Sequence, residues 1–361
     1  MFQKQRKKTK KQDKMQIEYD ISYSPNRTCD IYKLSKHSLH KTPNSTQPLV
    51  FLVHGGVWSF GCKQRLAGVA MTLCQFTQCV CVIPEYSLSE LNYVLLQHVL
   101  TADWVCLALL FVFVRHKKLL FVSMLISIVL TVLILIKLIR TSQQKPNHNV
   151  HPVHATDIAT CIEWVHTNAN RFQADKSRMI LIGHSAGAHI CALVTLNERF
   201  LPQNIRNDIR GVIGLSGVYC FFNLQKSIMK HFVNLNVFAE DADGLTETTF
   251  AEFDNLHKCD CEKCKLQLKR WDAVIDAWPR FHTRKKQHAI KNAAFLLVTS
   301  EMDLTLIDHA VVFAEELRKN NWKVQHVHFP STNHFSIRKY WDVEHKHIRS
   351  AVVGFINTIC I

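Results

Sequence analysis

The sequence predicts an α/β protein built around a mostly parallel, doubly wound sheet. Two observations carry this prediction: short apolar segments of strand length alternate with longer segments of helical spacing, and several of the short segments are apolar throughout. A strand that is apolar on both sides is buried on both faces, as parallel strands covered by helices are. At 361 residues, with 47% hydrophobic and 20% charged residues, the chain is long enough for one large domain of this class.

The expected elements follow one another along the chain. Residues 15–24 alternate apolar and polar side chains, as a half-buried strand does, and residues 29–34 are its expected partner. Six more strands, largely apolar, are expected at residues 48–56, 80–86, 178–185, 211–219, 295–303 and 322–329. Apolar residues recur at helical intervals at residues 61–76, 154–169, 186–196, 309–320 and 347–359. Because ligands bind beyond the carboxyl ends of the strands in such sheets, we expect the chemistry of the protein there.

The net charge and the cysteine content indicate which classes of protein the chain does not belong to. The formal net charge is +15, and residues 1–14 contribute seven Lys or Arg against one Asp, which predicts a basic, disordered tail. No zinc-finger spacing or ribonucleoprotein-type aromatic pattern accompanies the tail, so we expect no nucleic-acid partner. The 13 cysteines are odd in number and scattered, which favours a reducing compartment over a disulfide framework.

The stretch GHSAG, residues 183–187, is the strongest candidate for a reactive site. It fits G-x-S-x-G and lies between an apolar strand and an apolar helix, which is the context that this motif requires. Glycines at 183 and 187 remove side chains where a tight strand-to-helix turn crowds its neighbours. The pattern therefore predicts Ser185 as a nucleophile at the tip of the turn.

A nucleophilic serine needs a base, and the base needs an acid that orients it. Asp303 follows one strand and His334 follows the next, in the order Ser, Asp, His. We expect these two residues to complete the triad. Glu301 and Asp308 are alternatives for the acid. Two further histidines flank the nucleophile and are expected to be structural: His184 and His189.

The tetrahedral intermediate of acyl transfer also needs donors for its oxyanion. HGG at 54–56 supplies a glycine turn after an early strand, so that the N–H groups of Gly55 and Gly56 can point at the developing charge. The N–H of Ala186, next after the nucleophile, would complete the pocket. Each such donor contributes about 2.7–4 kcal/mol in the transition state. Neither a metal nor an organic cofactor is expected for this chemistry.

Several stretches together resemble a known family: HGGVWSFG, GHSAGAH, IRGVIGLSGVY, SEMD and NHF. They are similar to the α/β-hydrolase esterases of the HGG-x-W type, the group that holds arylformamidase and the prenylcysteine methylesterases. The resemblance covers about residues 28–92 and 150–358. It implies the α/β-hydrolase fold for a catalytic domain at 15–358, with the triad and the oxyanion donors named above. There are two departures. Val57 and Trp58 stand where the lipase-type motif has a third glycine, and a long apolar insert is absent from the soluble arylformamidases.

The insert, residues 93–139, predicts a helical hairpin in a membrane. Its halves, 93–114 and 119–139, each have about the 20 residues that cross a bilayer, and the short basic link RHKK joins them. Asp103 weakens the first half, because a carboxylate in mid-bilayer costs about 2.5–3.5 kcal/mol. Re-entrant or interfacial placement, a buried core helix and a gene-model artefact remain alternatives. With a hairpin, we expect a membrane protein, with the endoplasmic reticulum as one candidate location, and a catalytic domain that faces the cytosol.

Two further regions bear on function. Residues 221–291 have the aromatic and helical content of a cap or lid over the pocket, and they are expected to set specificity. HKCDCEKCK within this region offers Cys259, Cys261 and Cys264, but its spacing is not that of a standard zinc knuckle, so a loop with free thiols is favoured over a metal site.

Together with the motifs, these features predict a membrane-associated serine hydrolase. It would cleave the carboxylic ester of a lipid-like substrate through an acyl-enzyme. An arylformamidase-like amidase is the alternative with the same machinery. A non-catalytic membrane-binding protein that retains the fold is the alternative of another class.

Overall fold

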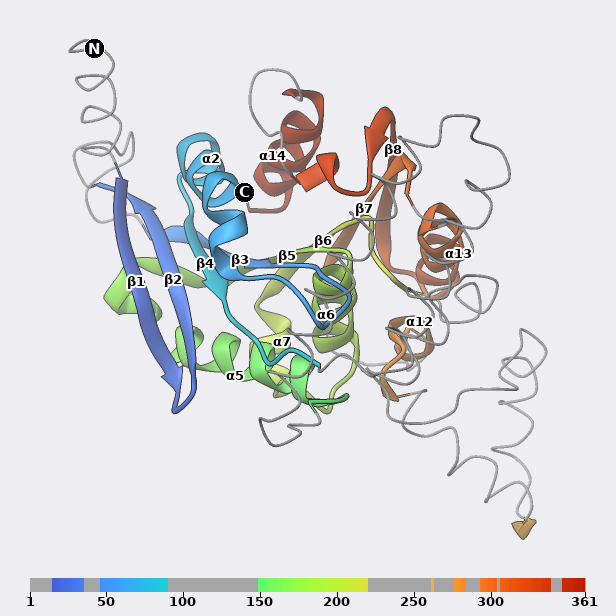
Figure 1. Ribbon diagram of the computed structural model, residues 1–361, viewed down its shortest axis with the longest axis horizontal. Coiled ribbons are helices and arrows are strands. Elements are labelled where there is room, and N and C mark those ends of the chain that lie inside the picture. The colour runs from blue at the N-terminus through green and yellow to red at the C-terminus, as the bar shows by residue number, and fades with distance from the viewer. Residues whose placement is uncertain are drawn as a thin grey trace, which may run out of the picture.

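The computed structural model describes residues 15–35, 46–89, 149–219, 261–262, 276–283, 293–303, 306–338 and 346–360 (Figure 1). The strands are β1 Met15–Ser24, β2 Arg27–Leu34, β3 Gln47–Val53, β4 Val80–Pro84, β5 Ala174–His184, β6 Ile209–Leu215, β7 Ala294–Met302 and β8 Lys323–Asn333. The helices are α2 Ala67–Thr77, α5 Val153–Thr167, α6 Ala186–Leu196, α7 Gln203–Asn207, α12 Pro279–His282, α13 Leu306–Lys319 and α14 Lys346–Cys360. Short 3₁₀ turns lie at Lys63–Leu66, Ala169–Phe172 and Ser336–Arg338.

The strands form a mixed sheet in the order β1-β2-β4-β3-β5-β6-β7-β8. β1 and β2 form an antiparallel hairpin, β2 pairs antiparallel with β4, and the six strands from β4 to β8 in this order are parallel. The chain crosses from β3 to β4 on one side and from β4 back past β3 to β5 on the other. The strand order therefore reverses beside β3, and such a switch point is where open α/β sheets bind their ligands.

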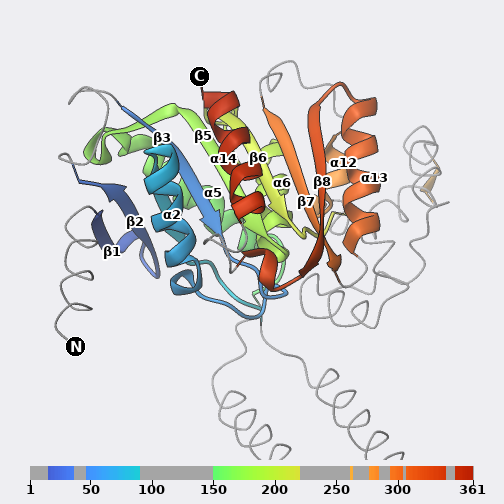
Figure 2. The same ribbon diagram turned by 90° about the horizontal axis from the view of Figure 1, so that it is seen from above.

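Helices cover both faces of the parallel part of the sheet (Figure 2). Alternate side chains of β5 explain this: Ile180 and Ile182 pack in the apolar layer under α2 and α14, whereas Met179 and Leu181 pack in the layer under α5, α6 and α13. Burying a side chain of this size contributes about 1.5–3 kcal/mol, so a strand that is apolar on both sides is stable only between two helical layers.

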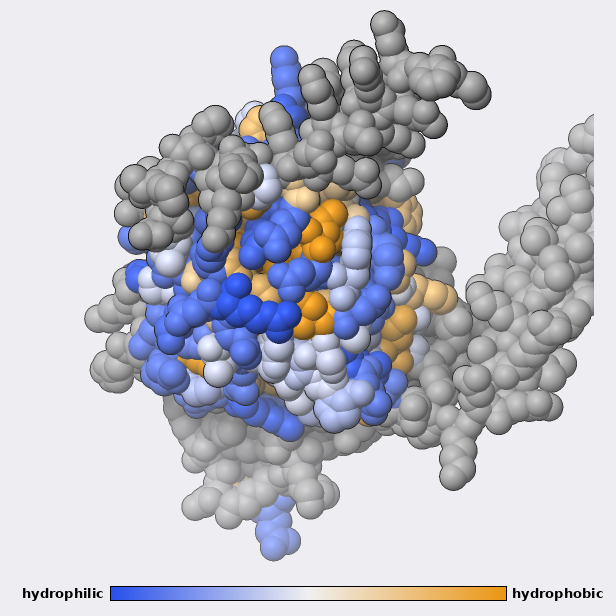
Figure 3. Space-filling model, turned by 90° about the vertical axis from the view of Figure 1, so that its left-hand side faces the viewer, coloured by the Kyte–Doolittle hydropathy of each residue, from blue (hydrophilic) through white to orange (hydrophobic). Residues whose placement is uncertain are grey.

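The hairpin of β1 and β2 forms one edge of the sheet, and Figure 3 views the molecule from this side. The surface there is mostly hydrophilic, with smaller hydrophobic areas between the polar side chains. β1 is accordingly only half-buried along its length. Polar side chains on an edge strand discourage pairing with another chain.

The fold class predicted from the sequence is confirmed. All eight expected strands and all five expected helices are present, with ends within a few residues of the expected ones, except that the helix expected from residue 61 starts at Ala67 after a 3₁₀ turn. The short helices α7 and α12 were not predicted. The expected tail 1–14, the apolar hairpin 93–139 and most of the cap 221–291 lie outside the described residues. Among the helices that are described, none has the length and hydropathy needed to span a bilayer.

Candidate active site

Ser185 occupies a sharp turn between β5 and α6. Its backbone has φ 54° and ψ −119°, a conformation that costs a residue with a side chain about 1–3 kcal/mol. The two glycines of the motif make the turn possible. A Cβ on Gly183 would lie 2.3 Å from the carbonyl carbon of Gly187, and one on Gly187 would lie 2.2 Å from the carbonyl oxygen of Val53. The Ser185 N–H donates to the Leu215 carbonyl at 2.9 Å, which ties the strained residue to β6.

His334 and Asp303 meet at the carboxyl ends of β8 and β7. Nδ1 of His334 donates to Oδ1 of Asp303 at 2.9 Å, and both side chains are buried. The Ser300 N–H donates to the other carboxylate oxygen at 3.2 Å. The His334 N–H also donates to the Met302 carbonyl at 3.0 Å, so the main chain holds the histidine beside the acid.

The same contacts decide between the three candidate acids. Glu301 is exposed, and its carboxylate accepts a hydrogen bond from the Ser331 N–H at 2.9 Å. Asp308 is exposed in the first turn of α13. Of the three, the structure brings Asp303 into contact with the histidine ring.

The residue before the serine joins the loop of His334 to the turn of Ser185. Nε2 of His184 donates to the main-chain carbonyl of His334 at 2.7 Å, and the two imidazole rings have centroids 4.8 Å apart. Within the described residues the Ser185 hydroxyl and the His334 ring are not joined by a hydrogen bond. Catalytic hydrogen bonds are often long in the free enzyme and tighten with the substrate. His184 was expected to be structural, and the structure shows which part of the site it holds.

The glycine turn after β3 lies against Ser185. A Cβ on Gly55 would lie 2.9 Å from Cβ of Ser185, so only glycine allows this approach. Gly56 has φ 132°, and its carbonyl accepts hydrogen bonds from the N–H groups of Ser59 and Phe60 at 3.0 and 2.7 Å. Within the described residues, neither glycine N–H donates a hydrogen bond. Ala186 is the first residue of α6, where an N–H has no partner within the helix. These three donors are free to face an oxyanion.

The departure from a third glycine has a structural explanation. Val57 and Trp58 both adopt positive φ, 51° and 55°, which is the conformation that glycine favours. Trp58 is buried and packs edge-on against His189, with ring centroids 5.0 Å apart. His189 in turn donates from Nε2 to the Ala277 carbonyl at 2.7 Å. The packing of the indole therefore holds a backbone that the residue type alone disfavours.

A tyrosine that was not foreseen supports the same turn. Tyr86 donates to the His54 carbonyl at 3.0 Å and stacks on the His54 ring at 4.3 Å. Burial lowers the pKa of His54 to about 4 and that of His189 to about 3, and it holds the pKa of His184 well below its usual value. These histidines are therefore neutral at physiological pH and serve as hydrogen-bonding and packing groups. The sequence signal for Tyr86 is weak, because a tyrosine after a strand is common.

Comparison with known proteins adds to the geometry. A family model described as BD-FAE matches residues 139–234. Two relatives come from Mycobacterium tuberculosis. Esterase LipC is 31% identical over 78 residues, which are 20% of this chain and 19% of LipC. The probable carboxylic ester hydrolase LipM is 21% identical over 188 residues, which are 51% of this chain and 30% of LipM. The matches thus span less than a third of either relative.

Solved structures match over nearly the whole chain. Carboxyl esterase 2 from Tuber melanosporum has a TM-score of 0.58 and 12% identity, and the match covers 96% of this chain and 88% of that protein. Esterase B from Lactobacillus rhamnosis has a TM-score of 0.60 and 13% identity, covering 99% and 93%. At these identities the likeness shows the fold. With its sheet topology and its serine turn, the chain has the α/β-hydrolase fold, and it is similar to the esterases named above.

Proposed function

We propose that the chain is a serine hydrolase that cleaves carboxylic esters through an acyl-enzyme. One observation carries this proposal: the hydrogen bond between His334 and Asp303 lies at the carboxyl ends of neighbouring strands, beside the strained Ser185 turn. Next to a serine on a strained turn, a buried Asp–His pair supplies an oriented general base. The similarity to esterases on the same fold supports the ester as substrate.

The mechanism follows from the positions of these groups. The Ser185 hydroxyl attacks the ester carbonyl while Nε2 of His334 takes its proton, and Asp303 stabilises the imidazolium that forms. The N–H groups of Gly55, Gly56 and Ala186 receive the oxyanion. The imidazolium then protonates the leaving alkoxide, and the alcohol departs. A water molecule, deprotonated by His334, releases the acid and restores the serine.

The test is covalent labelling with a fluorophosphonate, which captures an activated serine. Ser185→Ala should abolish labelling. Ser216→Ala is the matched control, since Ser216 is also buried, follows the neighbouring strand β6 and has positive φ; it should label like the parent. Equal labelling of parent and Ser185→Ala would place the nucleophile elsewhere. No labelling of any form would favour a binding protein that retains the fold.

We further propose a lipid-like ester presented by a membrane. The described residues on either side of the insert support this, because Ser89 donates from its hydroxyl to the Asn149 carbonyl at 2.6 Å, and the Asn149 amide donates to the Leu88 carbonyl at 3.1 Å. The chain thus leaves and re-enters the domain at one point. The Ser89 N–H also donates to the Trp58 carbonyl at 2.9 Å, so this point adjoins the glycine turn of the site. A hairpin rooted there would hold the site close to a bilayer.

Side chains next to the site support an apolar substrate. Met302 and Phe335, the neighbours of the acid and the base, are 66% and 58% exposed, and Phe60 beside the glycine turn is 44% exposed. The buried cysteines among the described residues form no disulfide, which agrees with a catalytic domain in a reducing compartment: Cys29, Cys74, Cys79, Cys81, Cys161 and Cys191. We therefore propose a membrane location, with the endoplasmic reticulum as one candidate, and a domain that faces the cytosol.

A variant that lacks residues 93–145 tests the membrane proposal. It should keep the hydrolysis of a short-chain soluble ester but lose most activity on long-chain esters in phospholipid vesicles. Full activity on the vesicles would remove the role of the insert. An aryl formamide in the same assay separates the alternative: hydrolysis of the formamide with a higher kcat/KM than that of any ester would assign an amidase.

A further inference from the structure

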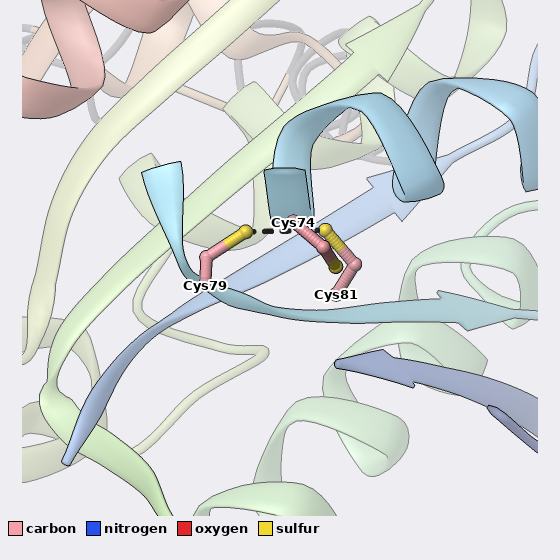
Figure 4. Close-up of side chains that lie close together, drawn as sticks. All are labelled: Cys74, Cys79 and Cys81. Carbon is pink, nitrogen blue, oxygen red and sulfur yellow. Dashed lines mark hydrogen bonds between the residues drawn. The ribbon is translucent and has the colours of Figure 1, made fainter. Parts of the chain in front are cut away.

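Three cysteines converge at the end of the sheet that is remote from the active site. Cys74 lies in the last turn of α2, Cys79 directly precedes β4, and Cys81 lies in β4, and their side chains point toward one another (Figure 4). They belong to the apolar layer under α2 and α14. Because β4 begins here, the three sulfurs lie at the amino end of the parallel strands, whereas Ser185 lies at the carboxyl end of β5.

The arrangement is compact and closed to solvent. The three sulfurs all lie within 4.8 Å of one another, and those of Cys79 and Cys81 are 3.3 Å apart. All three residues are fully buried. A cation that binds three sulfurs at about 2.3 Å requires sulfurs about 4 Å apart, which lies between these two distances. Small rotations of the side chains would therefore suffice to place an ion between them.

A turn of the backbone creates this convergence. Gln78, in the left-handed conformation with φ 51°, ends α2 and reverses the chain into β4, so that a residue of the last helical turn faces the start of the strand. Cys79 and Cys81 alternate with Val80, so both face the same side of β4. The carbonyl groups at the carboxyl end of a helix carry partial negative charge, which favours a cation nearby.

The thiols of the cluster take part in hydrogen bonds. Cys74 donates to the Tyr32 carbonyl at 3.3 Å, and burial raises the pKa of Cys74 and of Cys81. The sulfurs of Cys79 and Cys81 lie within hydrogen-bond distance of each other, at 3.3 Å. Metals bind the thiolate form of cysteine, so an ion at this site must displace thiol protons.

We propose that Cys74, Cys79 and Cys81 form a binding site for one thiophilic d¹⁰ cation, copper(I) or zinc(II). Soft sulfur ligands select these ions, whereas calcium and magnesium require oxygen ligands. Binding replaces the S–H protons, so an ion held by three thiolates releases up to three protons to solvent. The site joins α2 to β4 and would stabilise the fold; it takes no part in the proposed hydrolysis.

The coordination number distinguishes the two ions. Copper(I) is stable with three thiolates, whereas a structural zinc site takes four ligands. Cys360, at the end of α14, packs against the same apolar layer. Its sulfur lies outside the group of sulfurs within 4.8 Å of one another, so it would have to move closer to serve as the fourth ligand. Replacement of Cys360 by Ser should weaken the binding of zinc and leave that of copper(I) unchanged.

The experiment uses the full chain with Cys259, Cys261 and Cys264 replaced by Ser, so that these thiols bind no metal. The reduced protein is refolded without oxygen and titrated with copper(I) or zinc(II) against a chromophoric chelator. The protein should bind one equivalent of one of the two ions, and the thermal unfolding midpoint of the protein should then rise. Cys79→Ser and Cys81→Ala should each lower the affinity by more than about 100-fold, because even the outer partners of metal ligands contribute 10- to 100-fold.

Cys191→Ser is the matched control, because Cys191 is equally buried but lies on α6, on the other face of the sheet. It should bind like the parent. If the cluster variants do not fold, X-ray absorption of the metal-loaded parent decides instead: three or four sulfur neighbours at about 2.3 Å support the site, and nitrogen or oxygen neighbours overturn it. Failure of the parent to bind either ion would also overturn it. None of these readouts depends on ester hydrolysis.

Discussion

His184 donates from Nε2 to the main-chain carbonyl of His334 at 2.7 Å, so the residue before the proposed nucleophile holds the residue proposed as the base. The serine lies on the turn after β5 and the histidine lies after β8, with β6 and β7 between these strands. A direct hydrogen bond between the two loops fixes their separation without the help of a substrate. Because burial keeps His184 neutral, this bond does not change with pH in the physiological range.

We predict that His184→Phe lowers kcat by about 10- to 100-fold with little change in KM, because a misplacement of about 1 Å at a reacting group costs about 100-fold. Phe keeps an aromatic ring, although a larger one, but removes the donor, and the unpaired His334 carbonyl should cost about 1–3 kcal/mol of stability. Steady-state kinetics and urea unfolding measure both effects. A stability loss without any change in kcat would assign His184 a purely structural role.

Asp303→Asn should lower kcat by about 10⁴-fold, by analogy with the same change in a serine protease triad, because an amide favours the wrong imidazole tautomer. Two control variants, Glu301→Gln and Asp308→Asn, change exposed acids that the structure places away from the imidazole ring, and both should stay within about twofold of the parent. Hydrolysis of a soluble ester is the assay. Loss of activity in Glu301→Gln with retention in Asp303→Asn would reverse the assignment.

A pair of glycine substitutions tests the oxyanion turn. Gly55→Ala places a Cβ 2.5 Å from the His184 carbonyl and 2.9 Å from Cβ of Ser185, so the turn must move and the donors with it. Activity should fall by about 10²–10³-fold, the value of one lost oxyanion donor. Gly68→Ala, in α2, meets no atom within 4 Å and should stabilise the protein by about 0.5–1 kcal/mol with unchanged activity. Normal activity of Gly55→Ala would contradict the proposed oxyanion role.

The free energy of unfolding should fall as the pH is lowered, and His154 is a clear example. Burial lowers its pKa from the model-peptide value of 6.5 to about 4, and Nε2 lies 2.9 Å from the Ser89 hydroxyl. Between these two pH values the unfolded chain binds the proton and the folded chain does not. The stability from this group is therefore present above pH 6.5 and is lost as the pH falls toward 4. Over the whole window one such histidine accounts for up to about 3 kcal/mol, of which about 2 kcal/mol falls between pH 7 and pH 5.

The measurement is urea unfolding of the parent and of His154→Gln at pH 7 and pH 5. The variant is expected to be less stable at pH 7 but to lose less stability on acidification, by roughly 1–2 kcal/mol. Identical pH dependence in the two proteins would show that His154 titrates normally in the folded state.

Much of the fold could be predicted because its signals are local. The apolar run of β5, for example, needs no partner to be recognised, and the alternation of such runs with helical segments predicts a parallel sheet covered on both faces. The glycines of GHSAG likewise indicate a tight turn whatever surrounds it. The short helix α12 was missed because four residues carry too little periodicity to be distinguished from a loop.

The features of the candidate site can be separated in the same way, into those that the local sequence predicts and those that it does not. By itself the sequence determined the residue types and their order: a serine in a strand-to-helix turn, then an acid, then a histidine, with two glycines upstream. Tertiary structure alone decided that the histidine binds Asp303 rather than Glu301, that Val57 and Trp58 take the conformation of a missing glycine, and that His184 holds the base. These facts depend on distances between residues up to 150 positions apart, and such distances follow from strand order and side-chain packing, which no local pattern contains.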